Sequence, residues 1–238
     1  MIKKEYLKSE INKLGIQLSE NQLDQFLTYY ELLVEWNSFM NLTGITEFKD
    51  VVIKHFVDSL SLIKAVDLNR KISLIDVGTG AGFPGLPLKI AFPELKVTLL
   101  DSLQKRINFL DEVISTLQLT EVNTIHGRAE DFARPDKLRE TYDLCLSRAV
   151  ANLSTLSEYC LPFVKQQGYF ISYKSEKLSE ELHSANKAIA VLGGQFERQI
   201  DFTIGDENIY RNFVVIKKIN CTPRQYPRKS GTASKKPL

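Results

Sequence analysis

The sequence is poor in cysteine: Cys145, Cys160 and Cys221 are the only three among 238 residues. They lie far apart, and none belongs to a C-x-x-C pair or stands beside a histidine. Disulfide frameworks and structural zinc sites both need cysteines at characteristic short spacings. The sequence therefore predicts neither a disulfide framework nor a metal site, and we expect three reduced, buried thiols.

Long apolar runs are missing as well. No segment approaches the roughly 20 consecutive apolar residues that cross a bilayer, and the N-terminus lacks a charged and then apolar signal segment. With 43% hydrophobic residues, the chain can form one sizeable core plus an appendage rather than two full domains. We expect a soluble, cytoplasmic monomer without a membrane partner.

Acidic residues are absent from one end of the chain. The formal net charge is +2, but residues 217–238 carry +7 and contain no Asp or Glu, so the rest of the chain carries −5. A basic segment on an acidic body indicates a polyanionic partner such as RNA. A solvated end that only aids solubility is the alternative. The first choices for phosphate contacts are Lys218, Arg224, Arg228 and Lys229.

The stretch from Leu74 to Gly85, LIDVGTGAGFPG, is the one around which the rest of the chain is organised. An apolar run ends at a carboxylate and a cluster of glycines, and Pro84 suits the first position of a following helix. The pattern predicts a strand, a tight turn and a helix. In a parallel α/β sheet, the carboxyl end of such a strand binds nucleotide-like ligands, because glycines let the backbone approach them closely.

Two classes of cofactor fit these letters. The segment from Gly80 to Gly85 matches the G-x-G-x-x-G pattern of NAD(P)-binding oxidoreductases, but a lone match is weak. An acidic residue followed by alternating glycines instead resembles the first motif of S-adenosylmethionine (SAM) methyltransferases, and a merely structural turn is the third possibility. The candidate cofactor-binding residues of this motif are Asp76, Gly78, Gly80 and Gly82.

Polar residues follow three further predicted strands. Asp101 ends the second strand, where a carboxylate suits ribose hydroxyls, although it could instead cap the next helix. Residues 126–131 follow the third strand and can frame an adenine ring, with Glu130 as a polar contact. Arg148 ends the fourth strand, where it faces the cleft or pairs with Glu130 or Asp131.

The periodicity divides the chain into three parts. Residues 1–68 show helical patterns without a convincing strand, and within them His55 is interpreted as a partly buried polar residue. Residues 69–220 alternate strands with helices and end in two consecutive strands, which predicts an antiparallel hairpin at a sheet edge. Seven strands of this kind match an α/β SAM methyltransferase sheet better than a six-stranded dinucleotide fold. Residues 221–238 form a basic C-terminal tail.

Several motifs occur in a characteristic order along the chain. They are Trp36-Asn37 with Asn41-Leu42-Thr43, His55 to Ser59, Asp76 to Gly85, Asp101-Ser102-Leu103, Arg128-Ala129-Glu130, Ser147 to Val150, and Tyr226 to Thr232. Together they resemble, over nearly the whole chain, the bacterial 16S rRNA guanine-N7 methyltransferases, the glucose-inhibited division protein B family.

The resemblance implies a Rossmann-like class I SAM-dependent methyltransferase domain with a helical N-terminal extension. It implies SAM as the cofactor and methylation of one guanine in the 530 loop of 16S rRNA, either free or in the small ribosomal subunit or its precursor. By the same resemblance, SAM contacts fall at Gly78, Phe83, Ala129, Glu130 and Arg148.

Attack of guanine N7 on a methyl group requires little acid–base catalysis. N7 offers a lone pair and loses no proton when it attacks a methyl group, so no general base is expected, and alignment can supply roughly 7 to 11 kcal/mol. The sequence lacks both the Asn/Asp-Pro-Pro-aromatic loop of exocyclic-amine methyltransferases and a Pro-Cys nucleophile. We name no catalytic residue beyond Arg148, a candidate for positioning substrate or cofactor. A non-catalytic RNA-binding protein with a relict SAM pocket is the remaining alternative.

Overall fold

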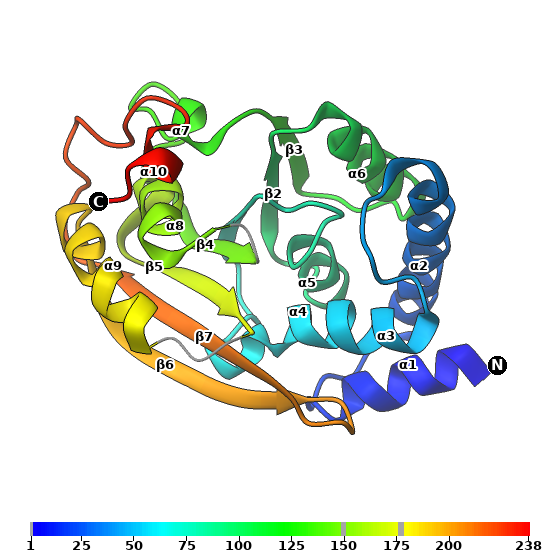
Figure 1. Cartoon of the computed structure of the whole chain (residues 1–238). Helices are drawn as coiled ribbons and strands as arrows, with labels where there is room; N and C mark the ends of the chain where they lie inside the picture. Colours follow the sequence, from blue (N-terminus) through cyan, green and yellow to red (C-terminus); the bar gives the residue numbers. More distant parts are fainter. Residues whose placement is uncertain (1, 149–150, 176–178) are drawn as a thin grey trace.

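The structure, a computed structural model, describes residues 2–148, 151–175 and 179–238 (Figure 1). The described residues before the first strand form helices and loops, as predicted. The helices are α1 (Ile2–Asn12), α2 (Glu20–Met40), α3 (Phe48–Val51), the π-helix η1 (Val52–Val57), α4 (Asp58–Leu60) and the 3-10 helix η2 (Ser61–Lys64).

The remainder alternates strands and helices before the terminal hairpin. Its elements are β1 (Ser73–Val77), α5 (Gly85–Ala91), β2 (Lys96–Asp101), α6 (Gln104–Thr116), β3 (Val122–His126), α7 (Ala129–Phe132), β4 (Tyr142–Arg148), α8 (Leu153–Cys160), the 3-10 helix η3 (Leu161–Phe163), β5 (Val164–Lys174), α9 (Ser179–Val191), β6 (Gly194–Ile204), β7 (Ile209–Lys218) and α10 (Thr232–Lys235). Ala149 and Val150, which belong to one motif, lie outside the described residues.

The described strands form one seven-stranded sheet with the order β3-β2-β1-β4-β5-β7-β6. The pairs from β3 to β5 are parallel, whereas β7 is antiparallel to both β5 and β6. The predicted α/β class and the antiparallel hairpin are therefore confirmed. Because β1 lies next to both β2 and β4, the glycine turn that follows β1 lies between the carboxyl ends of its two neighbours.

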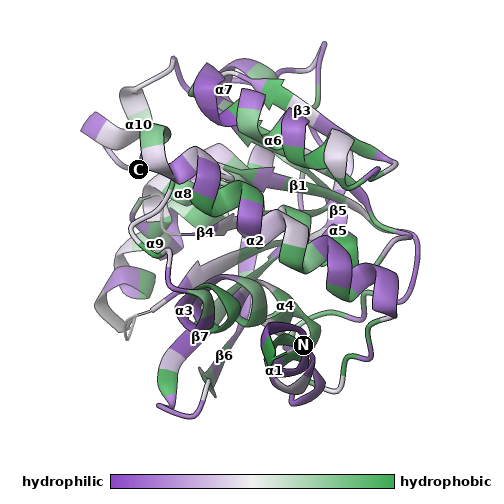
Figure 2. Ribbon diagram, turned by 90° about the vertical axis from the view of Figure 1, so that its right-hand side faces the viewer, coloured by the Kyte–Doolittle hydropathy of each residue, from purple (hydrophilic) through white to green (hydrophobic). Residues whose placement is uncertain are grey.

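Two hydrophobic clusters cover the two faces of the sheet. Residues of α1, α2, α5 and α6 pack with Leu74 and Leu99 on one face, and residues of α8, α9 and the 3-10 helix η3 pack with Ile75 and Leu100 on the other. This alternation along β1 and β2 is the expected result of side chains that point to opposite faces of a strand. Figure 2 shows hydrophobic residues concentrated on the strands and the helix sides that face them.

The helical extension is attached to the glycine turn by α2. Ser19 caps this helix and forms a capping box with Gln22, whose side-chain amide donates to the carbonyl of Ile90 in α5 at 2.7 Å. The hydroxyl of Tyr29, which is buried, donates to the carbonyl of Ala81 in the turn. The extension therefore forms part of the wall around the turn rather than a separate body.

Two sequence expectations, one about buried thiols and one about a helix start, are only partly right. Cys145 and Cys160 are buried, but Cys221 is exposed, because it lies in the C-terminal segment rather than in a core helix. Pro84 was expected at the first helical position, but α5 begins at Gly85 and Pro84 precedes it as the N-cap. Among the described residues, no helix is both long and apolar enough to cross a membrane.

Candidate active site

The buried side chain of Asp76 holds the shape of the glycine turn from the protein interior. Its Oδ2 atom accepts hydrogen bonds from the Thr79 hydroxyl at 2.7 Å and from the Gly85 amide at 2.9 Å, so one carboxylate oxygen joins both ends of the turn. The side chain is fully buried and its Oδ1 atom has no hydrogen-bond partner. Burial raises the pKa of this carboxyl to about 6, against the opposing effect of the two hydrogen bonds.

Gly82 is needed for packing. Its φ of 94° is unfavourable for other residues, and a Cβ atom there would lie 2.5 Å from Leu86 Cδ1 and 2.7 Å from Tyr29 Oη. Neither Asp76 nor Gly82 is among the residues that line the two cavities described below. Both set the shape of the turn, because their side-chain positions face the protein interior, and a direct contact of either with the cofactor stays a prediction.

A cavity of about 390 Å³, here called the glycine-turn cavity, opens above the turn. Gly80 has a φ of 63° and a Cβ built on it would meet no atom within 4 Å, so the backbone is open to a ligand at this point. The predicted residues that line this cavity are Gly78, Gly80, Phe83, Asp101 and Arg148, joined by Thr43, His55 and Arg106.

A smaller cavity of about 190 Å³ continues past the end of β2. It shares Gly78, Asp101 and Ser102 with the glycine-turn cavity, so the two form one trench along the carboxyl ends of the strands. Its far end is lined by Arg128, Ala129, Glu130 and Tyr159. The structure thus brings the predicted residues of the third strand's loop and of the glycine turn to one trench.

Asp101 supports the start of the next helix, one of the two roles that the sequence left open, while its contact with ribose stays a prediction. Its Oδ1 atom accepts from the Leu103 amide at 3.0 Å, and its Oδ2 atom accepts from the Gly80 amide at 2.9 Å and pairs with Arg106 at 3.1 Å. It therefore supports the start of α6 and holds the glycine turn, while it also lines the trench. Ser102 makes no capping hydrogen bond, because the N-cap position of α6 is Leu103.

Arg148 faces the cleft, as its place at the end of β4 predicted. Its partner is Asp58, at 2.8 Å, rather than the Glu130 or Asp131 proposed from the sequence. Asp58 lies in α4 of the helical extension, where the sequence pattern showed no reason to place a carboxylate near β4. The guanidinium lies 5.2 Å from the centroid of the Phe83 ring, within the range of a cation–π contact.

His55 is one of the site residues that sequence analysis missed, together with Asp58, Thr43 and Arg106. His55 is buried, its ring stacks on Phe83 with centroids 4.4 Å apart, and its Nε2 and Nδ1 atoms lie 2.9 Å from Thr43 Oγ1 and 3.2 Å from Arg148 Nη2. Burial and then the nearby Arg148 charge lower the pKa of His55 to about 3. The only signal in the sequence was its position in a motif, since a lone histidine has no spacing partner.

A further cavity of about 290 Å³, here called the side cavity, lies on the other side of Arg148. It shares His55 and Arg148 with the glycine-turn cavity, so the two cavities meet at these side chains. Asp58 lines it and also pairs with Arg211 of β7 at 2.9 Å. The other lining residues are Ile45, Lys54, Tyr173, Lys174 and Ser175.

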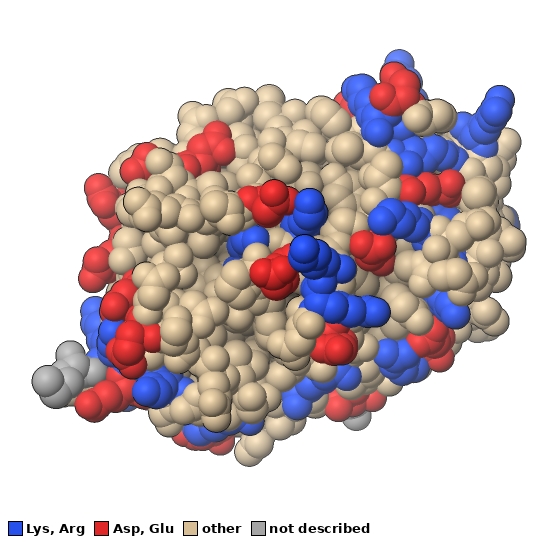
Figure 3. Space-filling view, turned by 180° about the vertical axis from the view of Figure 1, so that it is seen from behind, with Lys and Arg blue, Asp and Glu red and all other residues tan. Residues whose placement is uncertain are grey.

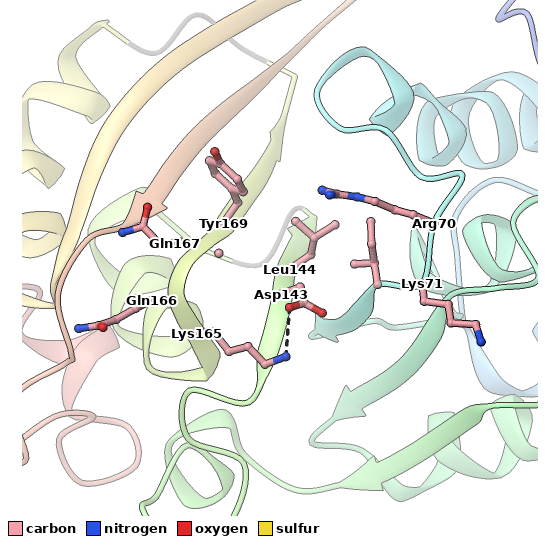
Figure 4. A pocket seen from close by; sticks show the side chains of 10 residues that line it. Arg70, Lys71, Asp143, Leu144, Lys165, Gln166, Gln167 and Tyr169 are labelled. Atoms are coloured by element: carbon pink, nitrogen blue, oxygen red, sulfur yellow. Dashed lines mark hydrogen bonds and ion pairs between the residues drawn. The ribbon is translucent and has the colours of Figure 1, made fainter.

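A hollow of about 270 Å³ at the opposite end of the sheet does not belong to this site (Figure 4). It lies at the amino ends of β1 and β4, away from the glycine turn. Asp143 in its wall accepts from the Ser73 amide at 2.8 Å and pairs with Lys165 at 3.0 Å. These contacts join the starts of β1, β4 and β5, which gives the cluster a structural role.

The basic residues chosen as phosphate contacts fall into two groups. Arg224 and Lys229 are exposed. The choice of Lys218 is wrong: its side chain is 0% exposed, and its Nζ pairs with Glu140 at 3.2 Å and donates to the Leu161 carbonyl and the Thr222 hydroxyl at 2.7 Å each. Arg228 is also committed elsewhere, because it pairs with the buried Glu158 at 2.6 Å.

The trench fits an adenosine-bearing, positively charged ligand such as SAM. The open backbone at Gly80 admits close approach, the carboxylates of Asp101 and Glu130 can accept from ribose and adenine, and both favour a nearby cation. Arg106 and Arg148 line the glycine-turn cavity and supply positive charge for the carboxylate in the amino acid part of such a ligand. No cluster of three metal-ligating side chains occurs among the residues that the structure describes.

The lowered pKa of His55 predicts a pH-dependent stability. Neutral His55 stabilises the folded state above pH 6.5, and this contribution is lost as the pH falls from 6.5 through about 3. We expect the unfolding free energy of the wild type, minus that of His55→Gln, to fall by about 1.4 kcal/mol per pH unit between pH 6.5 and 4. The difference is needed because the raised pKa of Asp76 makes the unfolding free energy change with pH in the opposite direction between pH 3.8 and 6. This contribution is common to both proteins and cancels.

Denaturant unfolding at half-unit pH intervals measures this difference. His126→Gln, at an exposed histidine, controls for loss of an imidazole as such. If the difference in unfolding free energy between wild type and His55→Gln does not change with pH, the folded state does not discriminate between neutral and protonated His55.

The chain has close relatives of known family. Residues 22–210 match the sequence profile of the family described as GidB, rRNA small subunit methyltransferase G. The chain is 53% identical over 228 residues to Ribosomal RNA small subunit methyltransferase G of Lachnoclostridium phytofermentans, covering 96% of this chain and 94% of the relative. It is 52% identical to the protein of the same name from Alkaliphilus metalliredigens over 100% of both chains.

Solved structures resemble the fold at low sequence identity. TrmN from Thermus thermophilus has a TM-score of 0.53 at 17% identity, covering 69% of this chain and 49% of that one. M. jannaschii TYW2 in complex with AdoMet has a TM-score of 0.52 at 16% identity, covering 63% and 71%. A SAM dependent methyltransferase from Aquifex aeolicus has a TM-score of 0.51 at 20% identity, covering 68% and 90%. These likenesses show that the sheet has the methyltransferase fold.

Proposed function

The chain belongs to the rRNA small subunit methyltransferase G family, and from this membership we propose that it transfers a methyl group from SAM to N7 of a guanine in the 530 loop of 16S rRNA. We further propose that it acts as a cytoplasmic monomer on 16S rRNA, either free or in a precursor of the small ribosomal subunit. SAM-dependent methyl transfer follows from the family; the nucleotide, the atom and the form of the RNA are the proposal.

The observation that carries the proposal is the junction of two cavities at His55 and Arg148. The glycine-turn cavity has the features of a SAM site. The side cavity is a separate space with its own polar lining and shares only the two junction residues with it. A ligand in the side cavity therefore borders a ligand in the glycine-turn cavity, which is the arrangement that direct group transfer requires.

The side chains at the junction favour alignment over proton transfer. When bound, SAM supplies a methyl group on a positively charged sulfur. Guanine N7 carries no proton, so nothing has to be removed as it attacks. His55, whose pKa is lowered to about 3, stays neutral near pH 7 and is too weak a base to compete for a proton. Its role is to stack on Phe83 and border Arg148.

The side cavity favours guanine over adenine. Arg148, Arg211 and Lys54 line it and can only donate hydrogen bonds at their charged groups. Guanine presents the O6 acceptor beside N7, whereas adenine presents an amino donor at the same position. The buried Asp58 carboxylate holds Arg148 and Arg211 in this lining, one with each of its oxygens.

RNA beyond the target base is expected to contact the side of the molecule that carries the tail. Figure 3 shows Lys and Arg side chains, interspersed with Asp and Glu, toward the side of the molecule where α7 and the loop after it lie. Exposed cations there include Arg128, Lys137, Arg224, Lys229, Lys235 and Lys236. Arg128 also lines the end of the cofactor trench, so this surface adjoins the site.

Neutralising Arg224 and Lys229 together, as Arg224→Gln and Lys229→Gln, is expected to weaken RNA binding. The slope of log K against log salt should flatten by roughly 1.4 to 1.8, the contribution of two phosphate contacts, because both side chains are exposed. SAM affinity should stay unchanged, since neither residue lines the trench. Fluorescence anisotropy across a salt series measures the slope.

The matched control for this pair is Arg70→Gln with Lys71→Gln. These two cations are also exposed but lie at the hollow on the opposite end of the sheet. Equal slopes for the Arg224/Lys229 variant and the wild type would remove the tail cations from RNA binding. A flattened slope for the control as well would indicate a diffuse charge effect.

The function is tested by incubating the protein with methyl-labelled SAM and unmodified RNA. Parallel reactions contain free 16S rRNA, precursor particles and finished small subunits, and the labelled nucleotide is mapped by nuclease digestion and mass spectrometry. Label at N7 of a single guanine in the 530 loop is the expected result. Label at another base or atom overturns the proposed target. RNA binding without transfer favours the relict-pocket alternative, and calorimetric binding of NADH without SAM favours an oxidoreductase.

A further inference from the structure

The C-terminal tail, residues 221–238, is held against the body by Arg228. Its Nε atom lies 3.0 Å from each oxygen of Glu158, its Nη2 atom lies 2.6 Å from Oε2, and its backbone amide donates to Oε1 at 2.7 Å. Glu158 lies in α8 and is 1% exposed. Bidentate pairs of this kind are geometrically specific, so the contact sets the position of the chain at Arg228.

The chain immediately after Arg228 reaches the nucleoside end of the cofactor trench. The Ser230 hydroxyl donates to Asp131 Oδ1 at 2.9 Å, and the Gly231 amide donates to Glu130 Oε1 at 2.8 Å. Glu130 is 4% exposed and lines the smaller cavity. A tail residue therefore holds one oxygen of a carboxylate that faces the trench, and this orients the other oxygen.

The same helix that anchors the tail also supplies a wall of the trench. Tyr159, which follows Glu158 in α8, lines the smaller cavity together with Ala129 and Glu130. After Gly231 the tail stays packed on α8, because Ala233 is buried and its carbonyl accepts from the Thr155 hydroxyl at 3.1 Å. The ion pair thus joins the tail, which contacts Glu130, to the helix that carries Tyr159, and both of these side chains line the smaller cavity.

We infer that the Arg228–Glu158 ion pair is a positioning device for the adenosine end of SAM: it sets the tail so that the Gly231 amide orients the Glu130 carboxylate in the trench. This inference rests on the proposed use of SAM. Arg228 and Glu158 do not line the trench and act through Gly231 and Glu130. A side chain ordered before binding costs less on binding, so loss of the device weakens SAM affinity.

The test measures SAM binding by calorimetry and steady-state kinetics with the full-length protein. Arg228→Gln and Glu158→Gln are each expected to raise the Kd and the KM for SAM about tenfold, equivalent to 1.4 kcal/mol. The kcat at saturating SAM should stay within about twofold, because the junction at His55 and Arg148 is untouched. 5′-Methylthioadenosine, which keeps the adenosine part and lacks the amino acid part, should lose the same factor.

A double-mutant cycle separates positioning from general stability. Glu130→Gln removes the charge that the device orients, so adding Arg228→Gln to it should cost less than twofold more in SAM affinity. Arg228→Lys, which retains the charge, should recover part of the loss and serves if Arg228→Gln does not fold. Glu10→Gln is the matched control: Glu10 is 5% exposed and pairs with Lys13 far from the trench.

The outcomes are distinguishable. If the wild type does not bind SAM, the proposed function fails. If the wild type binds SAM and Arg228→Gln binds equally well, the inference is overturned while the function stands. Additive losses in the cycle, or an equal loss of affinity in Glu10→Gln, would show that the ion pair acts through overall stability.

Discussion

Asp58→Asn is expected to lower the rate of methyl transfer roughly 100-fold, the scale of a misplaced group near the reacting atoms. The Asp58 carboxylate pairs with Arg148 through one oxygen and with Arg211 through the other, and its side chain is only 4% exposed. Asparagine keeps the shape but removes the charge that holds two guanidinium groups together. The arginines then repel each other at the junction of the two cavities, and Arg148 is released from Phe83.

The same change should lower the free energy of unfolding by about 3 kcal/mol, because removing one partner leaves other charges buried and uncompensated. Asp50→Asn, which removes an exposed pair with Lys54 on the same stretch of chain, should change it by less than about 1 kcal/mol. Single-turnover transfer and urea unfolding measure the two effects. Normal transfer by Asp58→Asn would mean that the position of Arg148 does not matter for the reaction.

Gly82→Ala is expected to destabilise the protein by about 2 to 5 kcal/mol. The φ of 94° costs about 1 to 2 kcal/mol for a residue with a side chain. The new Cβ would overlap Leu86 and the Tyr29 hydroxyl, and such overpacking costs about 1 to 3 kcal/mol more. SAM affinity should fall as a consequence. The new methyl group would push the turn away from Tyr29 of α2, and the turn would then lose its hydrogen bonds to Asp76.

Two other glycines separate the contributions to this result. Gly15→Ala, at a φ of 79° with no atom within 4 Å of the new Cβ, should show the cost of strain alone. Gly80→Ala meets no protein atom but lines the glycine-turn cavity, so it should lose SAM affinity with a stability loss close to that of Gly15→Ala. Thermal unfolding and SAM calorimetry on the three variants test this. Equal stability losses at Gly82 and Gly15 would contradict the packing role.

The network around Arg148 shows how the helical extension contributes to the candidate site. His55 and Asp58 come from the extension, whereas Arg148 and Arg211 come from strands β4 and β7. The side cavity has walls from both parts, and Tyr29 of α2 supports the glycine turn from the other side. Residues 1–68 are therefore an extension that packs against the rest of the fold and contributes side chains to the candidate site.

Much of the architecture could be read from the sequence, because local patterns determine it. The strand, glycine turn and helix around Asp76, the capping box at Ser19 and the terminal hairpin all depend on residues close together in the chain. The arrangement of Gly78, Asp101 and Arg148 along one trench was also predictable, since the carboxyl ends of neighbouring parallel strands meet at one edge of the sheet.

Only the tertiary structure decided which charges are available and which are used internally. Lys218 and Arg228 look in the sequence like Arg224 and Lys229, but the first two are paired with Glu140 and Glu158. Likewise, Asp58 and His55 acquire their roles from residues about 90 positions away in β4. The physical reason is that burial and long-range pairing depend on how distant segments pack, whereas hydrophobic periodicity and turn chemistry are properties of neighbouring residues.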